Sequence, residues 1–317
     1  MPQAGMLYTA LSTSTIWTVG LLSKLFLYGA ARTTVTGLPA FLSLLESRRR
    51  SLAAGEPIPR GLLTASNHKS VFDDPLIWGT LPLSHLLLGP ANHRHALGSA
   101  DICFTTLPTS VLFRLGQVHQ TYRLHKSPLG GLFQPTLNAL PQLLDGGAWV
   151  HIFPEGRVHQ HEAQQMRYFK WGVARLLLEP RVQPTFVPMF VTGLERVMAE
   201  DRGFPRFLPR VGKRIRVVYG AAVDDGRFAD LRGEWRALCE REGAARIEDS
   251  EVLRTGREAV ALRIEATRRV REEVLKLRRS LGYPDEEPGA GDPDTYRLPG
   301  MDAKEGRLAD GTLVKDT

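Results

Sequence analysis

Cysteine is scarce in this chain of 317 residues, which contains only Cys103 and Cys239. The two are far apart and neither belongs to a C-x-x-C pair, so the sequence indicates neither a disulfide framework nor a cysteine-bound zinc site. Histidine occurs in two close pairs, His93-x-His95 and His159-x-His161. Neither pair has a carboxylate or cysteine at a spacing that would complete a metal site, so we expect no metal ion.

Two common catalytic motifs are also missing. The sequence has no G-x-S-x-G turn that would expose a serine nucleophile after a strand. It has no glycine-rich fingerprint that would bind a nucleotide where a strand meets a helix. The sequence therefore indicates neither a serine nucleophile of this kind nor a nucleotide site.

Acidic residues are absent from the first 45 positions, and the first 23 carry no charged side chain. Residues 6–31 form an apolar stretch, diluted by Ser and Thr, that could cross a bilayer core of about 30 Å at about 1.5 Å per residue. Charge follows this stretch, at Lys24 and Arg32, which argues against a secretory signal. We predict a membrane-associated helix; a single span, an interfacial helix and an uncleaved targeting stretch all fit.

The chain has a basic surplus, with a net charge of +7 and an isoelectric point near 9.6. Such a surplus suits either nucleic acid or an anionic membrane surface. The basic residues are not gathered into a tract with interleaved aromatic residues, so the sequence favours the membrane and we expect no nucleic-acid partner. The sequence makes no prediction of the oligomeric state.

Apolar runs that alternate with helical patterns predict an α/β protein. Strand-like runs lie at 61–65, 116–123, 148–153, 185–191 and 215–219, and helical patterns at 38–52, 132–144, 169–178 and 251–281. Strands separated by helices of roughly 10–15 residues are typical of a largely parallel, mixed sheet flanked by helices. Ligands of such sheets gather beyond the carboxyl ends of the strands.

The stretch from Ser66 to Pro75 follows the first of these strands and carries the clearest chemical signal. His68 precedes Asp73 by five positions, and a carboxylate can hold one tautomer of an imidazole and stabilise its protonated form. Ser70-x-x-Asp73 reads as a capping box that opens a helix with Pro75 in its first turn. His68 would then lie just outside the helix, where it can fold back onto Asp73. In the plainer interpretation, Asp73 is only a helix cap and His68 only a loop residue.

Other polar groups follow other strands. Arg123 ends the second strand, and Glu155, Gly156 and Arg157 follow the third. A guanidinium suits a phosphate oxygen, and a glycine turn can offer backbone N–H groups to an anion. The plainer interpretations are a solvated charge for Arg157 and a carboxylate that holds the turn for Glu155. A histidine–aspartate base without a protein nucleophile indicates direct attack by a substrate hydroxyl, and phosphate contacts with an apolar N-terminus indicate a phospholipid.

Four strings, in this order, carry a resemblance to a known family. They are Asn67-His68-x-Ser70-x-x-Asp73-Asp74-Pro75, Ala100-Asp101-Ile102-Cys103-Phe104-Thr105, Trp149-Val150-His151-Ile152-Phe153-Pro154-Glu155-Gly156 and Phe169-Lys170-Trp171-Gly172. The chain resembles the glycerolipid acyltransferase superfamily over residues 60–220. Within it, the chain is similar to the mitochondrial phospholipid–lysophospholipid transacylases that remodel cardiolipin.

Two departures from the wider superfamily support this narrower resemblance. Coenzyme-A-dependent relatives have apolar residues before the arginine of their second motif, and Thr-Arg after F-P-E-G. Here the second motif reads His119-Gln120-Thr121-Tyr122-Arg123, and Arg157-Val158 follows Gly156. These differences argue against recognition of acyl-coenzyme A and lysophosphatidic acid.

The resemblance implies that His68 is the general base and that Asp73 orients it. Asn67, Ser70, Arg123, Glu155, Gly156 and Arg157 are the expected substrate-binding residues. It also implies no metal or coenzyme, and a mitochondrial membrane location facing the intermembrane space. The substrates would be a phospholipid, such as phosphatidylcholine, and a lysophospholipid, such as monolysocardiolipin, on an anionic, cardiolipin-containing surface. Two alternatives are an acyl-coenzyme-A-dependent lysophospholipid acyltransferase and a non-catalytic peripheral lipid-binding protein.

We divide the chain into four parts. They are an N-terminal membrane-associated segment (1–59), an acyltransferase core (60–225), a C-terminal helical region packed on the core (226–283) and a disordered tail (284–317) rich in Pro, Gly and Asp. Residues 184–194 are an apolar run that we expect to help attach the protein to the membrane, and the polar residues 227–250 read as an insertion. Residues 251–281 form an amphipathic helix that either packs on the core or contacts anionic lipid.

Overall fold

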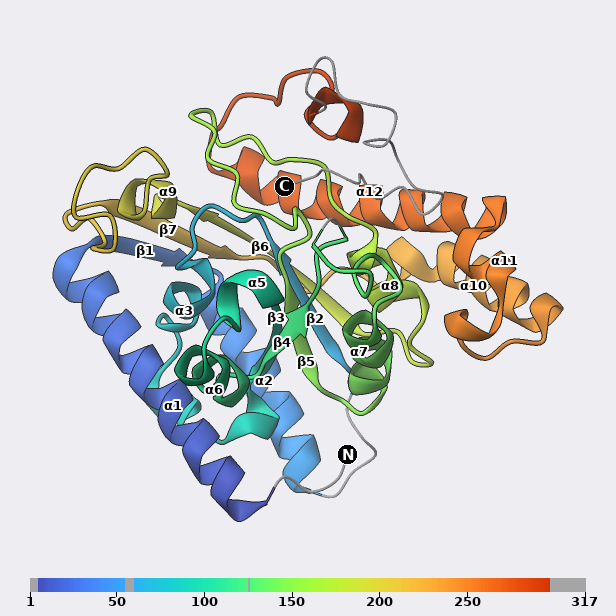
Figure 1. Cartoon of the computed structure of the whole chain (residues 1–317), viewed down its shortest axis with the longest axis horizontal. Coiled ribbons are helices and arrows are strands. Elements are labelled where there is room, and N and C mark those ends of the chain that lie inside the picture. The colour runs from blue at the N-terminus through green and yellow to red at the C-terminus, as the bar shows by residue number, and fades with distance from the viewer. Residues whose placement is uncertain (1–4, 55–59, 125, 297–317) are drawn as a thin grey trace.

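The computed structural model of the protein describes residues 5–54, 60–124 and 126–296. Within these residues a seven-stranded sheet lies at the centre, with helices on both faces (Figure 1). Side by side, the strands are β1 (Arg32–Thr36), β7 (Arg214–Tyr219), β6 (Thr185–Thr192), β2 (Leu62–Ser66), β5 (Trp149–Ile152), β3 (Arg94–Ser99) and β4 (Val118–Thr121). Neighbouring strands are parallel except β6 and β7, which are antiparallel. The predicted largely parallel, mixed α/β sheet is confirmed.

The helices connect these strands. In chain order they are α1 (Met6–Leu25), continued by a π-helical turn at Phe26–Ala30, α2 (Leu38–Ala53), α3 (Asp73–Trp78), α4 (Leu83–Leu86), α5 (Ala100–Cys103), α6 (Leu107–Leu115), α7 (Pro135–Asp145), α8 (Gly172–Leu178), α9 (Leu194–Val197), α10 (Gly226–Glu242), α11 (Glu251–Thr255) and α12 (Arg257–Ser280). Single 3-10 turns lie at Pro90–Asn92, Ile247–Asp249 and Pro293–Tyr296.

Strand β2 shows why the central strands are apolar throughout. All five of its residues are buried, because helices cover both faces of the sheet. Leu62 points into a core cluster that includes Phe41 of α2, on one face. Leu63 points to the other face, into a cluster that includes Val173 of α8 and Val270 of α12. The middle of the sheet is therefore a rigid support for the loops that follow its strands.

Two strands were not predicted. Strand β1 lies within the segment interpreted as a separate membrane-associated part, yet it pairs with β7 from Arg32 to Thr36 and so extends the core sheet toward the N-terminus. Strand β3 begins at Arg94, in a polar run that reads as a loop. Both strands contain few large apolar residues, only Val35 in β1 and Leu97 in β3, which hides the apolar signal on which strand prediction depends.

Helix α1 confirms the predicted N-terminal helix. Within the described residues, Met6–Ala30 is the one helical stretch long and apolar enough to cross a membrane by length and composition. A buried stripe on one side, which includes Ser12 and Gly20, packs against the body of the protein. A side chain at Gly20 would place Cβ 2.3 Å from Leu86, so the glycine permits this close approach. The opposite side exposes large apolar residues: Leu7, Leu11, Leu22 and Leu25.

The expectation that residues 184–194 help attach the protein to a membrane is wrong. This run forms β6, which lies between β2 and β7 in the sheet. Seven of the eight residues of β6 are buried, among them Phe186 and Phe190. The apolar run is long because both faces of the strand are covered, so its side chains cannot reach lipid.

Most of residues 227–250, which we interpret as an insertion, form the helix α10. Phe228, Leu231, Trp235 and Leu238 recur at helical spacing and are buried against α8 and α12. Helix α12 packs on α8 and β6, as the first of the two interpretations of that helix predicts. Its buried residues include Leu262, Val270 and Val274.

The predicted disorder of the tail does not apply to residues 284–296. Glu286 accepts a hydrogen bond from the backbone N–H of Met166 at 2.7 Å and forms an ion pair with Arg271 at 2.5 Å. Arg278 of α12 donates to the Pro284 carbonyl and to backbone carbonyls of the 163–164 region. The rest of the predicted disordered tail, residues 297–317, lies outside the described residues.

Candidate active site

Asn67, the first residue of the loop that follows β2, is hydrogen-bonded to β6, the strand that pairs with β2 in the sheet. The Asn67 side chain donates to the carbonyl of Val191 and accepts from the N–H of the same residue, both at 2.8 Å. These two bonds imitate a sheet ladder one residue beyond the end of β2. The chain then leaves the sheet and reaches α3 within six residues.

Asp73, the first residue of α3, gathers the loop around one carboxylate oxygen. Its Oδ2 accepts hydrogen bonds from His68 Nδ1 at 2.8 Å and from the backbone N–H groups of Lys69 and Ser70 at 2.5 and 2.9 Å. A carboxylate oxygen only accepts, so Nδ1 of His68 carries the hydrogen and Nε2 offers its lone pair. Asp73 is fully buried, whereas the His68 side chain is 22% exposed. His68 therefore folds back onto Asp73, as the sequence predicts, and its Nε2 atom makes no contact with the carboxylate.

The His68 ring also packs against the residue that follows β5. Phe153, the residue after β5, stacks on the imidazole with centroids 4.4 Å apart and planes at 22°. The edge of Phe153 in turn meets the buried His151 ring at 4.6 Å. Burial lowers the pKa of His151 to about 3, so this second histidine is neutral. The aromatic contact fixes the plane of His68 without competing for its Nε2 atom.

Glu155 fixes the backbone of the same histidine. It is fully buried, and its two oxygens accept from the N–H groups of His68 and Arg167, both at 2.8 Å. Burial raises the pKa of this carboxyl, an effect that the charge of Lys69 opposes. The His68 carbonyl accepts from the N–H of His159 at 2.8 Å, so both sides of the residue are tied down.

Asn67, Ser70 and Glu155 therefore lie behind the site. All three side chains are fully buried. Ser70 Oγ accepts from the N–H of Phe72 at 3.1 Å and so shapes the start of α3. Their contacts within the protein position the loop, and the predicted direct contact of these residues with substrate stays a prediction.

The two predicted arginines lie in different surroundings. Arg123 follows β4, an edge strand separated from β2 by β5 and β3, and it forms an ion pair with Asp101 of α5. The Arg123 guanidinium lowers the pKa of Asp101 to about 2. Arg157 is exposed and has no hydrogen-bond or ion-pair partner within the described ranges. Arg157 thus lies in the loop of Glu155, whereas Arg123 forms its ion pair after β4, the third strand from β2.

Gly156 makes the turn after Glu155 with a φ of 67°, a left-handed conformation that favours glycine. Its N–H donates to the Phe153 carbonyl at 3.0 Å, so this amide closes the turn and is not free for the predicted anion contact. A Cβ at this position would come within 2.9 Å of the Lys170 side chain. Lys170 thus lies against the turn that carries Gly156 and Arg157.

Two lysines were not singled out from the sequence. Lys170 belongs to Phe169-Lys170-Trp171-Gly172, one of the four strings that carry the family resemblance, and that string is the sequence signal that could have indicated it. Lys69, beside the histidine, is fully buried and donates to the carbonyls of His159 and Gln165 at 3.1 and 3.0 Å. Burial lowers the pKa of this ammonium, and the nearby Glu155 carboxylate opposes that effect. Lys69 therefore ties the 159–165 loop to the base.

Asp74 has a different task from its neighbour. It pairs with Arg94 of β3 and accepts from Trp78 Nε1 at 2.9 Å. Burial opposes ionisation of this carboxyl, but the Arg94 charge and the hydrogen bonds outweigh it and hold the pKa below its usual value. Asp74 thus links α3 to the sheet, whereas Asp73 serves His68.

The chain is similar to several known proteins. The profile of the Acyltransferase family matches residues 50–192. The tafazzin of Saccharomyces cerevisiae is 31% identical over 332 residues, covering 93% of this chain and 85% of the relative. The N-acylphosphatidylethanolamine synthase of Arabidopsis thaliana is 33% identical over 195 residues, covering 61% and 63%. A solved structure, the 1-acyl-sn-glycerophosphate acyltransferase of Thermotoga maritima, is 14% identical with a TM-score of 0.49, over 87% of this chain and 81% of that one.

The parallel sheet, the His68–Asp73 pair beyond β2 and the family match together define a phospholipid acyltransferase. The resemblance to the glycerolipid acyltransferase superfamily is confirmed. Within that class the similarity to tafazzin extends over nearly the whole chain. This chain belongs to the tafazzin family.

Proposed function

We propose that this protein is a coenzyme-A-independent transacylase that moves an acyl chain from a phospholipid, such as phosphatidylcholine, to a lysophospholipid, such as monolysocardiolipin, and so remodels cardiolipin. The observation that carries the proposal is the 2.8 Å bond between His68 Nδ1 and Asp73 Oδ2, which leaves Nε2 of an orientated imidazole free. The described residues contain no group of three or more metal-ligating side chains.

In the proposed reaction, Nε2 of His68 takes the proton from the hydroxyl of the lysophospholipid. The oxygen attacks the acyl carbonyl of the second phospholipid, and the tetrahedral intermediate releases the oxygen of that lipid. His68 returns the proton to the leaving oxygen, so the base is regenerated. Asp73 keeps the hydrogen on Nδ1 and stabilises the imidazolium between the two transfers. One ester replaces another, so the equilibrium constant is close to one.

The groups around Gly156 are the best candidates for headgroup contact. Arg157 is exposed and available, and Lys170 lies against the same turn. A cation there suits the phosphate of either lipid. Arg123 remains a weaker candidate, because Asp101 already neutralises it. Asn67, Ser70 and Glu155 act on His68 by holding its loop.

We place the enzyme on a mitochondrial membrane, facing the intermembrane space, as the similarity to tafazzin suggests. The apolar outer side of α1 supports attachment to the membrane, because exposed leucines are stabilised in an acyl layer. The partners are its two lipid substrates and an anionic, cardiolipin-containing surface. We propose no nucleic-acid partner.

The test is acyl exchange between labelled phosphatidylcholine and a lysophospholipid in liposomes without coenzyme A, for the wild type and His68→Ala. Transfer by the wild type that disappears in the variant supports the transacylase and its base. Transfer that begins only when acyl-coenzyme A is added supports a coenzyme-dependent acyltransferase. Liposome binding without transfer under either condition supports a non-catalytic lipid-binding protein. Equal transfer by both proteins shows that His68 is not the base.

The plant relative is named for N-acylation of phosphatidylethanolamine, and the same base could serve an amine as acceptor. The products of the exchange assay separate the two outcomes. Mild alkali removes an ester-linked acyl chain and spares an amide-linked one. We expect the transferred chain to be lost on this treatment.

A further inference from the structure

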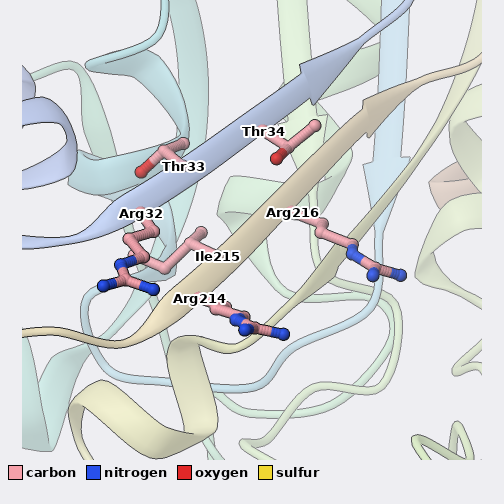
Figure 2. Close-up of a pocket in the computed structure, with 6 residues that line it drawn as sticks. All are labelled: Arg32, Thr33, Thr34, Arg214, Ile215 and Arg216. Carbon is pink, nitrogen blue, oxygen red and sulfur yellow. The ribbon is translucent and has the colours of Figure 1, made fainter.

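Three arginines at one corner of the sheet share a face. Arg32 of β1 lies opposite Arg214 of β7, and Thr34 lies opposite Arg216. Successive residues of a strand point to opposite faces, so Arg214 and Arg216 project together while Ile215 between them is buried. Figure 2 shows these side chains around a pocket of about 260 Å³. Both strands carry their exposed cations on the same side of the sheet.

Within the part of the chain that the structure describes, no acidic side chain neutralises these cations. None of Arg32, Arg214 and Arg216 has a side-chain hydrogen bond or an ion pair within residues 5–54, 60–124 and 126–296. Other exposed arginines are paired with glutamates, for example Arg268 with Glu265 at 2.7 Å and Arg241 with Glu258 at 2.5 Å. Like charges on adjacent strands repel one another, and a bound anion would relieve this repulsion.

The loop that leads into β7 adds apolar groups to the same corner. In residues 199–213, Phe204 is 91% exposed and Phe207 72% exposed, and Leu208 and Val211 are also exposed. The end of this loop is bound to the end of the N-terminal helix, because Gly212 N–H donates to the Ala30 carbonyl at 2.7 Å. Exposed apolar groups of α1 and of its π turn are thereby joined to those of the loop.

Charge around the loop has one sign. Residues 202–223 contain no acidic residue and six basic ones: Arg202, Arg206, Arg210, Lys213, Arg214 and Arg216. The guanidinium groups of Arg202 and Arg210 donate to carbonyls within the loop, which gives it a fixed shape without neutralising it. Exposed aromatic residues among unpaired cations match an anionic lipid surface, where the rings enter the acyl boundary and the cations meet phosphates.

We propose that this corner docks on anionic phospholipid. We call it the β7 surface and define it by Arg32, Arg214, Arg216, Phe204 and Phe207. The ligand is the phosphate of lipid headgroups, which the exposed guanidinium groups of this corner contact, while the two phenylalanines enter the bilayer beside them. This inference deepens the proposed function, on which it rests for the presence of a membrane.

Docking there has a consequence for the active site. Strand β7 runs antiparallel to β6, so its first residues lie at the edge where β2 and β6 end; Arg216 is opposite Thr192. His68 follows β2 at that same edge. The β7 surface would therefore present the His68 edge of the sheet to the lipid layer, from which both substrates come.

The first experiment compares flotation of the full-length protein with vesicles of phosphatidylcholine alone and with vesicles containing about 20 mol% phosphatidylglycerol. The test variant is Arg32→Gln/Arg214→Gln/Arg216→Gln. The matched control, Arg241→Gln/Arg254→Gln/Arg268→Gln, removes three exposed arginines that are paired with glutamates. We expect the test variant to lose binding to anionic vesicles by about tenfold or more, and the control by less than about twofold. Equal binding by the test variant and the wild type, or equal losses in both variants, overturns the proposal.

A second measurement does not depend on how strongly α1 holds the membrane. Phe204→Cys in a Cys103→Ser/Cys239→Ser background carries an environment-sensitive fluorophore, and Val252→Cys in α11 serves as the control site. A blue shift at position 204 only, with anionic vesicles, supports insertion; no shift there overturns it. If inorganic phosphate displaces the vesicles at matched ionic strength, the site holds free phosphate and not a lipid headgroup. His68→Ala should bind vesicles as the wild type does, so failure of the β7 surface and failure of the transacylase are distinguishable.

Discussion

Two charged regions lie at the same edge of the sheet and are built in opposite ways. In the 67–73 loop the charged groups are buried and engaged: Asp73 accepts three hydrogen bonds and Lys69 donates two. At the β7 surface the charged groups are exposed and unpaired within the described residues. A buried charge with many partners fixes a geometry, whereas an exposed charge without a partner awaits a ligand. The first region is suited to chemistry and the second to attachment.

If the 67–73 loop serves chemistry and the β7 surface serves attachment, substitutions in the loop lower turnover and leave vesicle binding intact. The largest effect is expected for His68→Ala, which removes the base. General acid–base groups contribute about 10²–10⁴-fold, so the rate of transfer should fall by that factor. The measurement is acyl exchange in detergent micelles, with flotation as the control. A variant that loses binding as much as turnover would contradict the division.

The next effect separates two neighbouring carboxylates. Asp73→Asn removes the charge that holds Nδ1–H of His68, so turnover should fall about 10²-fold or more while the melting temperature changes less. Asp74→Asn is the matched change, and it breaks the pair with Arg94. We expect it to lower the free energy of unfolding by about 1–3 kcal/mol with turnover per folded molecule nearly intact. Kinetics and urea unfolding of both variants check this, and the reverse pattern would show that Asp74 serves the base.

Contacts between residues close together in the sequence could be predicted from it, whereas contacts that depend on the order of the strands could not. His68 and Asp73 are only five residues apart, so their contact could be predicted locally. The predicted capping box at Ser70 is wrong, because Phe72 is the N-cap of α3 and no side chain within the described residues caps the helix. The grouping of Arg123 with them stays a prediction, because it depends on strand order, and two strands, β5 and β3, stand between β2 and β4. Strand β1 was missed because Arg-Thr-Thr-Val-Thr has a weak apolar pattern and is a strand only through its partner β7. The burial of Lys69 could not be predicted, since lysine is seldom buried.

Low pH should act on the buried interior. Burial lowers the pKa of His93, His151 and His159 to about 3, and that of His95 to about 4. These values lie below the ordinary value near 6.5, so the folded protein prefers the neutral rings. Their stabilising contribution is complete above about pH 6.5 and is lost as the pH falls toward 4. Each histidine accounts for up to about 1.4 kcal/mol per pH unit.

The check is urea unfolding between about pH 7.5 and pH 5. We expect the free energy of unfolding to fall with pH, and to fall less steeply in His159→Gln, which removes one of the titrating rings. Flotation with anionic vesicles at about pH 7.5 and pH 6 is the control, because arginine does not titrate there. Binding that changes as steeply as stability would show that the two regions are coupled.

The smallest effect is expected for the β7 surface on catalysis. Arg32→Gln/Arg214→Gln/Arg216→Gln leaves the His68 loop untouched, so turnover in detergent micelles should stay within about twofold of the wild type. On anionic vesicles its apparent KM should rise about threefold to tenfold, since fewer molecules reach the lipid, and kcat should stay unchanged. Added salt should raise the KM of the wild type toward that of the variant, because screening weakens the same contacts. A fall of kcat in micelles would instead place these arginines in the reaction, and the separation between the two regions would then be wrong.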